Sequence, residues 1–279
     1  MKSNILVIGG TGKTGRRVVE KLNQLGQNVR IGSRSENPSF DWNDPSTYAQ
    51  ALKGMDMAYI VYYPDLAVPG AKEAIDSLAK AAKAEGLKKV VLLSGKGEKE
   101  AELCEKIISD SGLNYTIVRA SWFSQNFSEG FFIDPILAGH VALPMAEVKV
   151  PFVDVNDIAE MVVEALMDDQ HNGRLYELTG PRAITFKEAI AEISRATGRD
   201  IGFREISMEE YNQQMKAMQV PDDFIWLINY LFTEVFGSAS ISEISTDIEK
   251  VLKRPATDFS DYAQCTAETG AWTPVVNPL

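Results

Sequence analysis

Three glycines near the start of the chain have a spacing that suits phosphate binding. Gly9, Gly12 and Gly15 form a G-x-x-G-x-x-G pattern between an apolar run at 5–8 and an amphipathic stretch at 14–26. A strand that enters a glycine turn lets backbone N–H groups approach a pyrophosphate, and the N-terminus of the next helix adds unsatisfied donors. The pattern therefore predicts a dinucleotide site; the alternative is a tight turn that serves only packing. Three further loop residues are assigned to the same site: Thr11, Lys13 and Thr14.

The residues after the second predicted strand favour the phosphorylated dinucleotide. An NAD site places a carboxylate about 20 residues beyond the glycines, where it holds the ribose hydroxyls. Ser33 and Arg34 stand at that position, and Glu36 follows two places further on. The Arg34 guanidinium offers a forked cation to a 2′-phosphate, and Lys13 can add a second charge. We therefore expect NADP(H) as the cofactor, the alternative being that Arg34 is an ordinary exposed arginine.

Four more residues are placed beside the cofactor by their positions at strand ends. Asp41 and Trp42 follow a short third strand, where they would flank the adenine. Tyr62 and Tyr63 end a fourth strand, at the edge expected to hold the nicotinamide half. For Tyr63 a core aromatic is the alternative.

The elements that must position these residues alternate between two periodicities. Short apolar runs occur at 5–8, 29–31, 57–63, 90–94 and 115–121. Helix-period stretches separate them, at 14–26, 71–86 and 98–112. This alternation predicts βαβ units and an α/β fold, a Rossmann-type doubly wound parallel sheet buried on both faces. We expect an NADP-binding domain at 1–150 and a smaller, mixed, closely packed part at 151–279 that completes the sheet and the substrate pocket.

An aromatic cluster follows the sixth predicted strand, where ligands of open α/β sheets lie. Trp122, Phe123 and Phe127 can stack against a flat substrate, and Asn126 offers a polar contact. The alternative is an aromatic seam that joins the two parts of the chain. The apolar tract 224–236 is too short for a membrane span and is a buried helix, a pocket lid or a homodimer face.

Composition narrows the class of protein. The chain has 279 residues, of which 45% are hydrophobic, and a formal net charge of −11, which disfavours nucleic-acid binding. Two cysteines and two histidines, without metal-ligand spacing, predict no metal site. The sequence shows no signal-peptide pattern at its start, so we expect a cytoplasmic protein. We also expect it to act on a small molecule and not to bind membranes.

Several segments together resemble the NmrA-like branch of the atypical short-chain dehydrogenases. The resemblance rests on GGTGKTGRRV, VVLLSG, TIVRASWFSQNFSEGFF, VPFVDVNDIA and YELTGP, together with the Arg34 position. It implies a Rossmann fold and usually NADP(H). The branch includes quinone, isoflavone-type and ergot-alkaloid-type reductases, and members that sense cofactor without turnover. Ser94 matches a serine of the family and is a candidate for binding nicotinamide or substrate, or for a turn hydroxyl.

The sequence departs from the wider superfamily at its catalytic pair. The segment 95–112 lacks the tyrosine that active short-chain dehydrogenases place four residues before a lysine, and the family's lysine position falls near Ala101. Lys96 is a weak catalytic candidate, because Lys96 and Lys99 lie in a charged run typical of a solvated helix start. Hydride transfer to a quinone or an iminium compound remains feasible without this pair. A non-catalytic redox sensor is the main alternative, and a nucleotide-sugar epimerase is less favoured.

Overall fold

The computed structural model describes residues 2–238 and 240–274, which divide into two compact units. The first unit comprises Met1–Ala120, Val155–Leu178 and Asp247–Arg254, and the remaining segments form the second. This differs from the single boundary predicted at residue 150. The reason is that the chain returns to the first unit after Asp154, adding a helix and an edge strand to the parallel sheet.

The first unit is built on a six-stranded parallel sheet with the order β2-β1-β3-β4-β5-β8. Its strands are β1 (Asn4–Ile8), β2 (Asn28–Gly32), β3 (Met57–Ile60), β4 (Lys89–Gly95), β5 (Asn114–Ala120) and β8 (Arg174–Leu178). The predicted Rossmann-type sheet is confirmed. The expected short third strand is not a strand: Asp41 forms only an isolated bridge with Asp44, and β1 pairs directly with β3.

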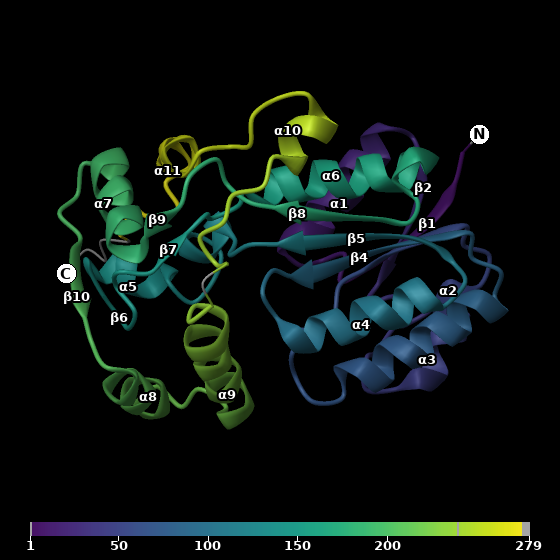
Figure 1. Ribbon diagram of the computed structural model, residues 1–279, viewed down its shortest axis with the longest axis horizontal. Helices are drawn as coiled ribbons and strands as arrows, with labels where there is room; N and C mark the ends of the chain where they lie inside the picture. Colours follow the sequence, from purple (N-terminus) through teal and green to yellow (C-terminus); the bar gives the residue numbers. More distant parts are fainter. Residues whose placement is uncertain (1, 239, 275–279) are drawn as a thin grey trace. The chain divides into compact units, whose positions relative to one another are not determined.

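Helices cover both faces of this sheet (Figure 1). On one face, α3 (Ala71–Ala84) packs between α2 (Tyr48–Leu52) and α4 (Lys99–Asp110). On the other, α6 (Val155–Met167) contacts α1 (Lys13–Gln24) and α10 (Asp247–Leu252). Burial on both faces explains why the strands read as continuous apolar runs rather than alternating patterns.

The second unit contains two small strand pairs and several helices. Strands β6 (His140–Leu143) and β10 (Gly202–Glu205) run parallel, whereas β7 (Lys149–Val150) and β9 (Ile184–Thr185) are antiparallel. The helices are α5 (Ile133–Ala138), α7 (Phe186–Thr197), α8 (Met208–Ala217), α9 (Asp222–Tyr230) and α11 (Phe259–Glu268), and a π-helix at Leu231–Val235 extends α9. Among residues 2–238 and 240–274, no helix is long and apolar enough to span a membrane.

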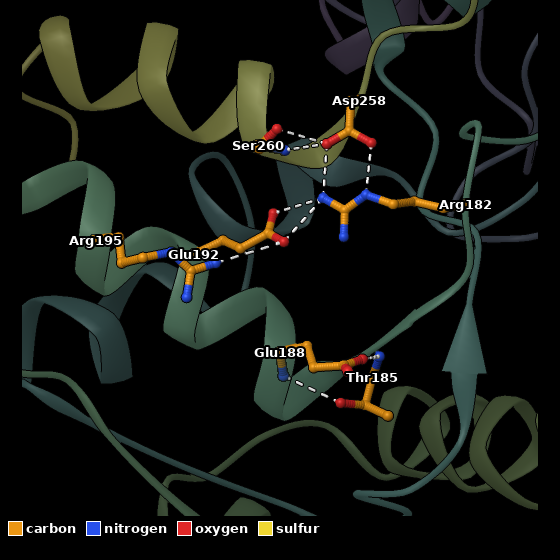
Figure 2. Close-up of polar contacts among 7 residues, drawn as sticks. All are labelled: Arg182, Thr185, Glu188, Glu192, Arg195, Asp258 and Ser260. Atoms are coloured by element: carbon orange, nitrogen blue, oxygen red, sulfur yellow. Dashed lines mark hydrogen bonds and ion pairs between the residues drawn. The ribbon is translucent and has the colours of Figure 1, made fainter.

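An ion-pair network fixes α11 to α7 and to the segment before β9 (Figure 2). The Arg182 guanidinium donates two hydrogen bonds of 2.6 Å to the Asp258 carboxylate and a third, of 2.8 Å, to Glu192 on α7. Asp258 also caps α11 by accepting from the Ser260 N–H at 2.8 Å. These hydrogen bonds, that from Arg182 first, lower the pKa of Asp258 to about 2. The contribution of the ionised Asp258 to folding stability is therefore complete above the ordinary pKa of an aspartate, and it is lost as the pH falls toward 2.

We expect Arg182→Ala to lower the free energy of unfolding by about 1–3 kcal/mol, because it leaves the buried Glu192 carboxylate without its main partner. Urea unfolding near neutral pH measures the change. Arg195→Ala is the matched control: Arg195 is exposed and lies 3.7 Å from Glu192, so its loss is expected to cost at most about 1 kcal/mol. Equal losses in the two variants would contradict this account of the network.

Candidate functional site

The glycine loop joins β1 to α1 and is held by its own backbone. Gly9 has a φ of +73°, which favours glycine, and its N–H donates to the Gly32 carbonyl of β2 at 3.1 Å. The Gly12 N–H donates back to the Gly9 carbonyl at 2.9 Å. These bonds fix the turn next to the carboxyl end of β2, where a dinucleotide ribose would be recognised.

The absence of a side chain at Gly15 allows α1 to pack against this turn. A Cβ on Gly15 would overlap the carbonyl oxygen of Gly9, and one on Gly10 would lie 2.9 Å from the Ile31 side chain. Gly12 is the N-cap of α1 and supplies no side-chain acceptor, so the first turn of the helix has no side-chain cap. Such a turn presents N–H donors to an anion, and the loop therefore fits a pyrophosphate.

The other loop residues divide between surface and core. Thr11 is exposed and Lys13 half-buried, and the Lys13 carbonyl accepts from Arg17 at 2.8 Å. Thr14 is buried, and its hydroxyl accepts from the Tyr59 hydroxyl at 3.0 Å. The Thr14 side chain thus fastens α1 to β3.

Arg34 lies in the turn after β2 with its side chain exposed. Within residues 2–238 and 240–274, the structure gives its guanidinium no hydrogen bond or ion pair. The neighbouring Ser33 carbonyl instead accepts from the Phe40 N–H at 2.9 Å, which closes the loop. Glu36 is also exposed. A cation without a protein partner at this position is available to a phosphate ligand.

The predicted adenine residues belong to an aromatic cluster at the edge of the first unit. Trp42 is half-buried, lies 4.7 Å from Tyr62 between ring centroids, and donates from Nε1 to the Val61 carbonyl at 3.2 Å. The Asp41 carboxylate accepts from the Asn43 N–H at 3.0 Å. Tyr63 is 79% exposed, which excludes the core alternative for this side chain.

Ser94, at the end of β4, is engaged by an ion pair that the sequence did not reveal. Its hydroxyl donates to Glu105 Oε1 at 2.6 Å, and Arg119 on β5 donates to both oxygens of the same carboxylate, at 2.7 and 2.6 Å. Both Ser94 and Glu105 are buried. The hydroxyl is thus neither a turn cap nor a free contact for a ligand in this structure.

The charged run after β4 is buried in part, which corrects its interpretation as a solvated helix start. Lys99 is exposed, but Lys96 is buried, with its Nζ 3.9 Å from Glu177 Oε2. Glu98 is 7% exposed, and its carboxyl fills the space that a Cβ on Gly95 would occupy. No periodicity signals this burial, because glycine at 95 is what makes room for the glutamate.

Glu98 hydrogen-bonds the carboxyl group of Asp65 from the loop after β3. Asp65 Oδ1 also accepts from the Ala67 N–H at 2.8 Å, whereas Glu98 Oε2 has no hydrogen-bond partner in the described part of the chain. Burial, above all, raises the pKa of both carboxyls, and the negative charge of Asp65 raises that of Glu98 further.

The predicted pocket wall lies in the second unit. Trp122, Phe123 and Asn126 are half-buried, and the Trp122 ring lies 4.7 Å from that of Phe236. Phe127 is a core residue instead: it is fully buried among other phenylalanine rings, so it presents no surface to a substrate. In the tract 224–236, Phe232 and Phe236 are buried, whereas Trp226 is 45% exposed.

The family resemblance can be tested against the whole chain. Residues 1–263 match the profile of the NmrA-like family. The chain belongs to the NmrA-like family. The expectation from the quoted segments is therefore confirmed, and it extends well beyond the glycine loop into the second unit.

Relatives of this NmrA-like chain match it almost end to end. Prestalk A differentiation protein A of Dictyostelium discoideum is 30% identical over 95% of this chain and 93% of its own length. An NAD(P)H azoreductase of Xenophilus azovorans is 28% identical, covering 94% of this chain and 98% of its own. The NADP(H) complex of Citrobacter sp. triphenylmethane reductase shares the fold, with a TM-score of 0.75 and 19% identity over 95% of this chain and 99% of its own.

We expect Gly15→Ala to lower the free energy of unfolding by about 1–3 kcal/mol, because the added methyl group overlaps the Gly9 carbonyl oxygen. Denaturant unfolding of the variant measures the change. Gly12→Ala is the matched control: its Cβ would lie 3.2 Å from the same oxygen, and φ at Gly12 is −78°. We expect it to cost at most about 1 kcal/mol; a larger loss for Gly12→Ala would contradict the packing argument.

Proposed function

We propose that this NmrA-like chain is an NADPH-dependent reductase that transfers hydride to a planar, electron-poor acceptor such as a quinone or an iminium compound. The observation that carries the proposal is the glycine turn without a side-chain cap at the start of α1, together with an exposed Arg34 just after β2 that has no partner among the described residues. Together these features suit a pyrophosphate and a 2′-phosphate of one dinucleotide.

Each part of the cofactor has candidate residues in the first unit. The backbone of Gly9, Thr11 and Gly12, with the first turn of α1, would hold the pyrophosphate, and Arg34 would hold the 2′-phosphate with help from Lys13. Asp41 and Trp42 remain proposed neighbours of the adenine, and Tyr62 and Tyr63 of the nicotinamide half. When bound, NADPH supplies the hydride.

The surroundings of Ser94 favour an acceptor that needs no strong acid. Helix α4 contains no tyrosine, and the Ser94 hydroxyl is committed to Glu105. Reduction of a ketone requires a proton donor at the developing alkoxide, whereas a conjugated electron-poor acceptor spreads the incoming charge. The names of the azoreductase and the triphenylmethane reductase point the same way, since both describe conjugated substrates. Trp122, Phe123 and Asn126 are the proposed acceptor contacts.

The absorbance of NADPH, followed while quinones, iminium compounds, azo dyes and aldehydes are added one at a time, tests this proposal. We expect saturable oxidation with the planar conjugated acceptors above the reaction without protein, and little with the aldehydes. Tight NADPH binding without oxidation by any of these acceptors would contradict the reductase and favour the redox sensor.

Arg34→Glu is expected to weaken NADPH binding by about 10- to 100-fold while leaving NADH nearly unchanged, because a charge-assisted bond to the 2′-phosphate becomes a repulsion. Calorimetric titration with both dinucleotides measures the two affinities. Lys53→Glu is the matched control, since it makes the same charge change at another exposed position. A parent protein that binds NADH as tightly as NADPH would overturn the assignment of Arg34.

A further inference from the structure

Two carboxyl groups in the first unit, those of Asp65 and Glu98, hydrogen-bond each other. Within residues 2–238 and 240–274, neither of them forms an ion pair. Asp65 follows β3 and Glu98 follows β4, so both lie beyond the carboxyl ends of neighbouring parallel strands. Glu98 is 7% exposed and Asp65 half-buried. A hydrogen bond between two carboxyl groups needs a hydrogen on one of them, because ionised carboxylates only accept. One proton shared by the pair would meet this requirement.

The charged groups around the pair favour keeping this proton. The negative charges of Asp65, Glu100 and Glu105 raise the pKa of Glu98. Of these three acids, Glu105 forms an ion pair with Arg119. Burial raises the pKa of the neighbouring Cys104 thiol to about 11. The negative charges of Glu105, Glu73 and Asp65 raise this pKa further, whereas the positive charge of Lys72 lowers it.

One oxygen of Glu98 leaves the hydrogen-bonding capacity of the pair incomplete. Oε2 is buried and has no hydrogen-bond partner among the residues that the structure describes, which is costly for a carboxyl group in a protein interior. The Glu98 carboxyl occupies the space that a Cβ on Gly95 would fill, so the glycine backbone determines where this carboxyl lies. On the other side of the pair, Asp65 as a whole residue is half-buried, and its Oδ1 accepts from the Ala67 N–H.

We propose that the Asp65–Glu98 pair is a proton reservoir that releases its proton when the oxidised cofactor binds and retains it when the reduced cofactor binds. The inference rests on the proposed function. In an open α/β sheet the ligand lies beyond the carboxyl ends of the strands at the switch point, which here is between β1 and β3. Asp65 follows β3 and is therefore on that edge.

The two redox states differ by one charge on the nicotinamide ring. The oxidised ring is a cation and the reduced ring is neutral, so the oxidised state alone favours a second negative charge on nearby carboxyls. By linkage, the ionised pair must then strengthen binding of the oxidised cofactor to the same extent. The pair would thus couple cofactor preference to pH.

The same proton completes the proposed reaction. The acceptor gains two electrons and one hydrogen as hydride from NADPH, and a quinone then carries a negative charge. The pair supplies the second hydrogen as a proton, its carboxyl O–H bond breaking as the O–H bond of the product forms. Water later returns a proton to the pair.

Calorimetric titrations of NADP⁺ and NADPH, each in buffers with different ionisation enthalpies, count the protons released on binding. Measured from about pH 6 to about pH 9, a range that reaches documented buried glutamates, NADP⁺ should release up to one proton. Its Kd should fall by up to about tenfold per pH unit in the window where the free pair keeps its proton. For NADPH we expect little proton release. The titration of the pair should change the Kd of NADPH by at most about twofold over the same pH range.

Glu98→Gln and Asp65→Asn should each abolish the difference in proton release between the two cofactors. Two variants are used because either substitution at so buried a pair can impair folding, which circular dichroism detects. Glu100→Gln is the matched control, an exposed acid on α4 that should retain the difference. Equal release with NADP⁺ and NADPH, or a difference that survives in both pair variants, would overturn the inference.

Infrared spectroscopy of the protein without cofactor separates this inference from the proposed function. A protonated carboxyl band that persists at neutral pH and disappears in Glu98→Gln is the expected result. Absence of that band would overturn the reservoir directly. If the band is present but neither dinucleotide binds, the proposed function fails and the linkage to cofactor fails with it, while the shared proton stands.

Discussion

The close approach of Gly15 to the carbonyl oxygen of Gly9 is the contact on which the arrangement of the first unit depends. It sets the distance between β1 and α1, and α1 in turn packs against α6, which the chain supplies only after residue 154. At the same turn Gly12, the N-cap of α1, leaves the first turn of the helix without a side-chain cap. Gly15 therefore serves the packing of α1 on the turn, whereas Gly12 leaves the N–H donors at the start of the helix without a side-chain partner.

Acidic side chains beyond β3 and β4 are satisfied in two different ways. Glu105 accepts two hydrogen bonds from Arg119 and a third from the Ser94 hydroxyl. Glu98 has no cation partner among the described residues and hydrogen-bonds Asp65 instead. In the first case the buried carboxylate is paired with a cation, whereas in the second burial raises the pKa of both carboxyls and favours their protonated form. The two acids thus differ in chemistry although they lie seven residues apart on one sequence segment.

Local patterns predicted the elements of the fold, and long-range contacts decided the site. The parallel strands and α1 follow from apolar runs and a glycine turn, and Thr185 with Glu188 forms the capping box that opens α7. The burial of Lys96 and Glu98 could not be predicted, because it depends on Gly95 and on Asp65, which is 33 residues away from Glu98 in the sequence. The sequence also could not show that Phe127 is surrounded by rings, since aromatic spacing is the same in a core and in a pocket wall.

The reactions that the residues near the carboxyl ends of β3 and β4 could support depend on which of their protons can be transferred. The Ser94 hydroxyl donates to Glu105, which Arg119 also binds, so the hydroxyl proton is already engaged in a short hydrogen bond. The Thr14 and Tyr59 hydroxyls are buried against each other, and burial raises the Tyr59 pKa. Among these groups, the Asp65–Glu98 pair is the one that can give up a proton and gain compensation from an incoming cation. A reductase built on it would need acceptors whose reduction is driven by hydride first and completed by a proton second, as for a quinone.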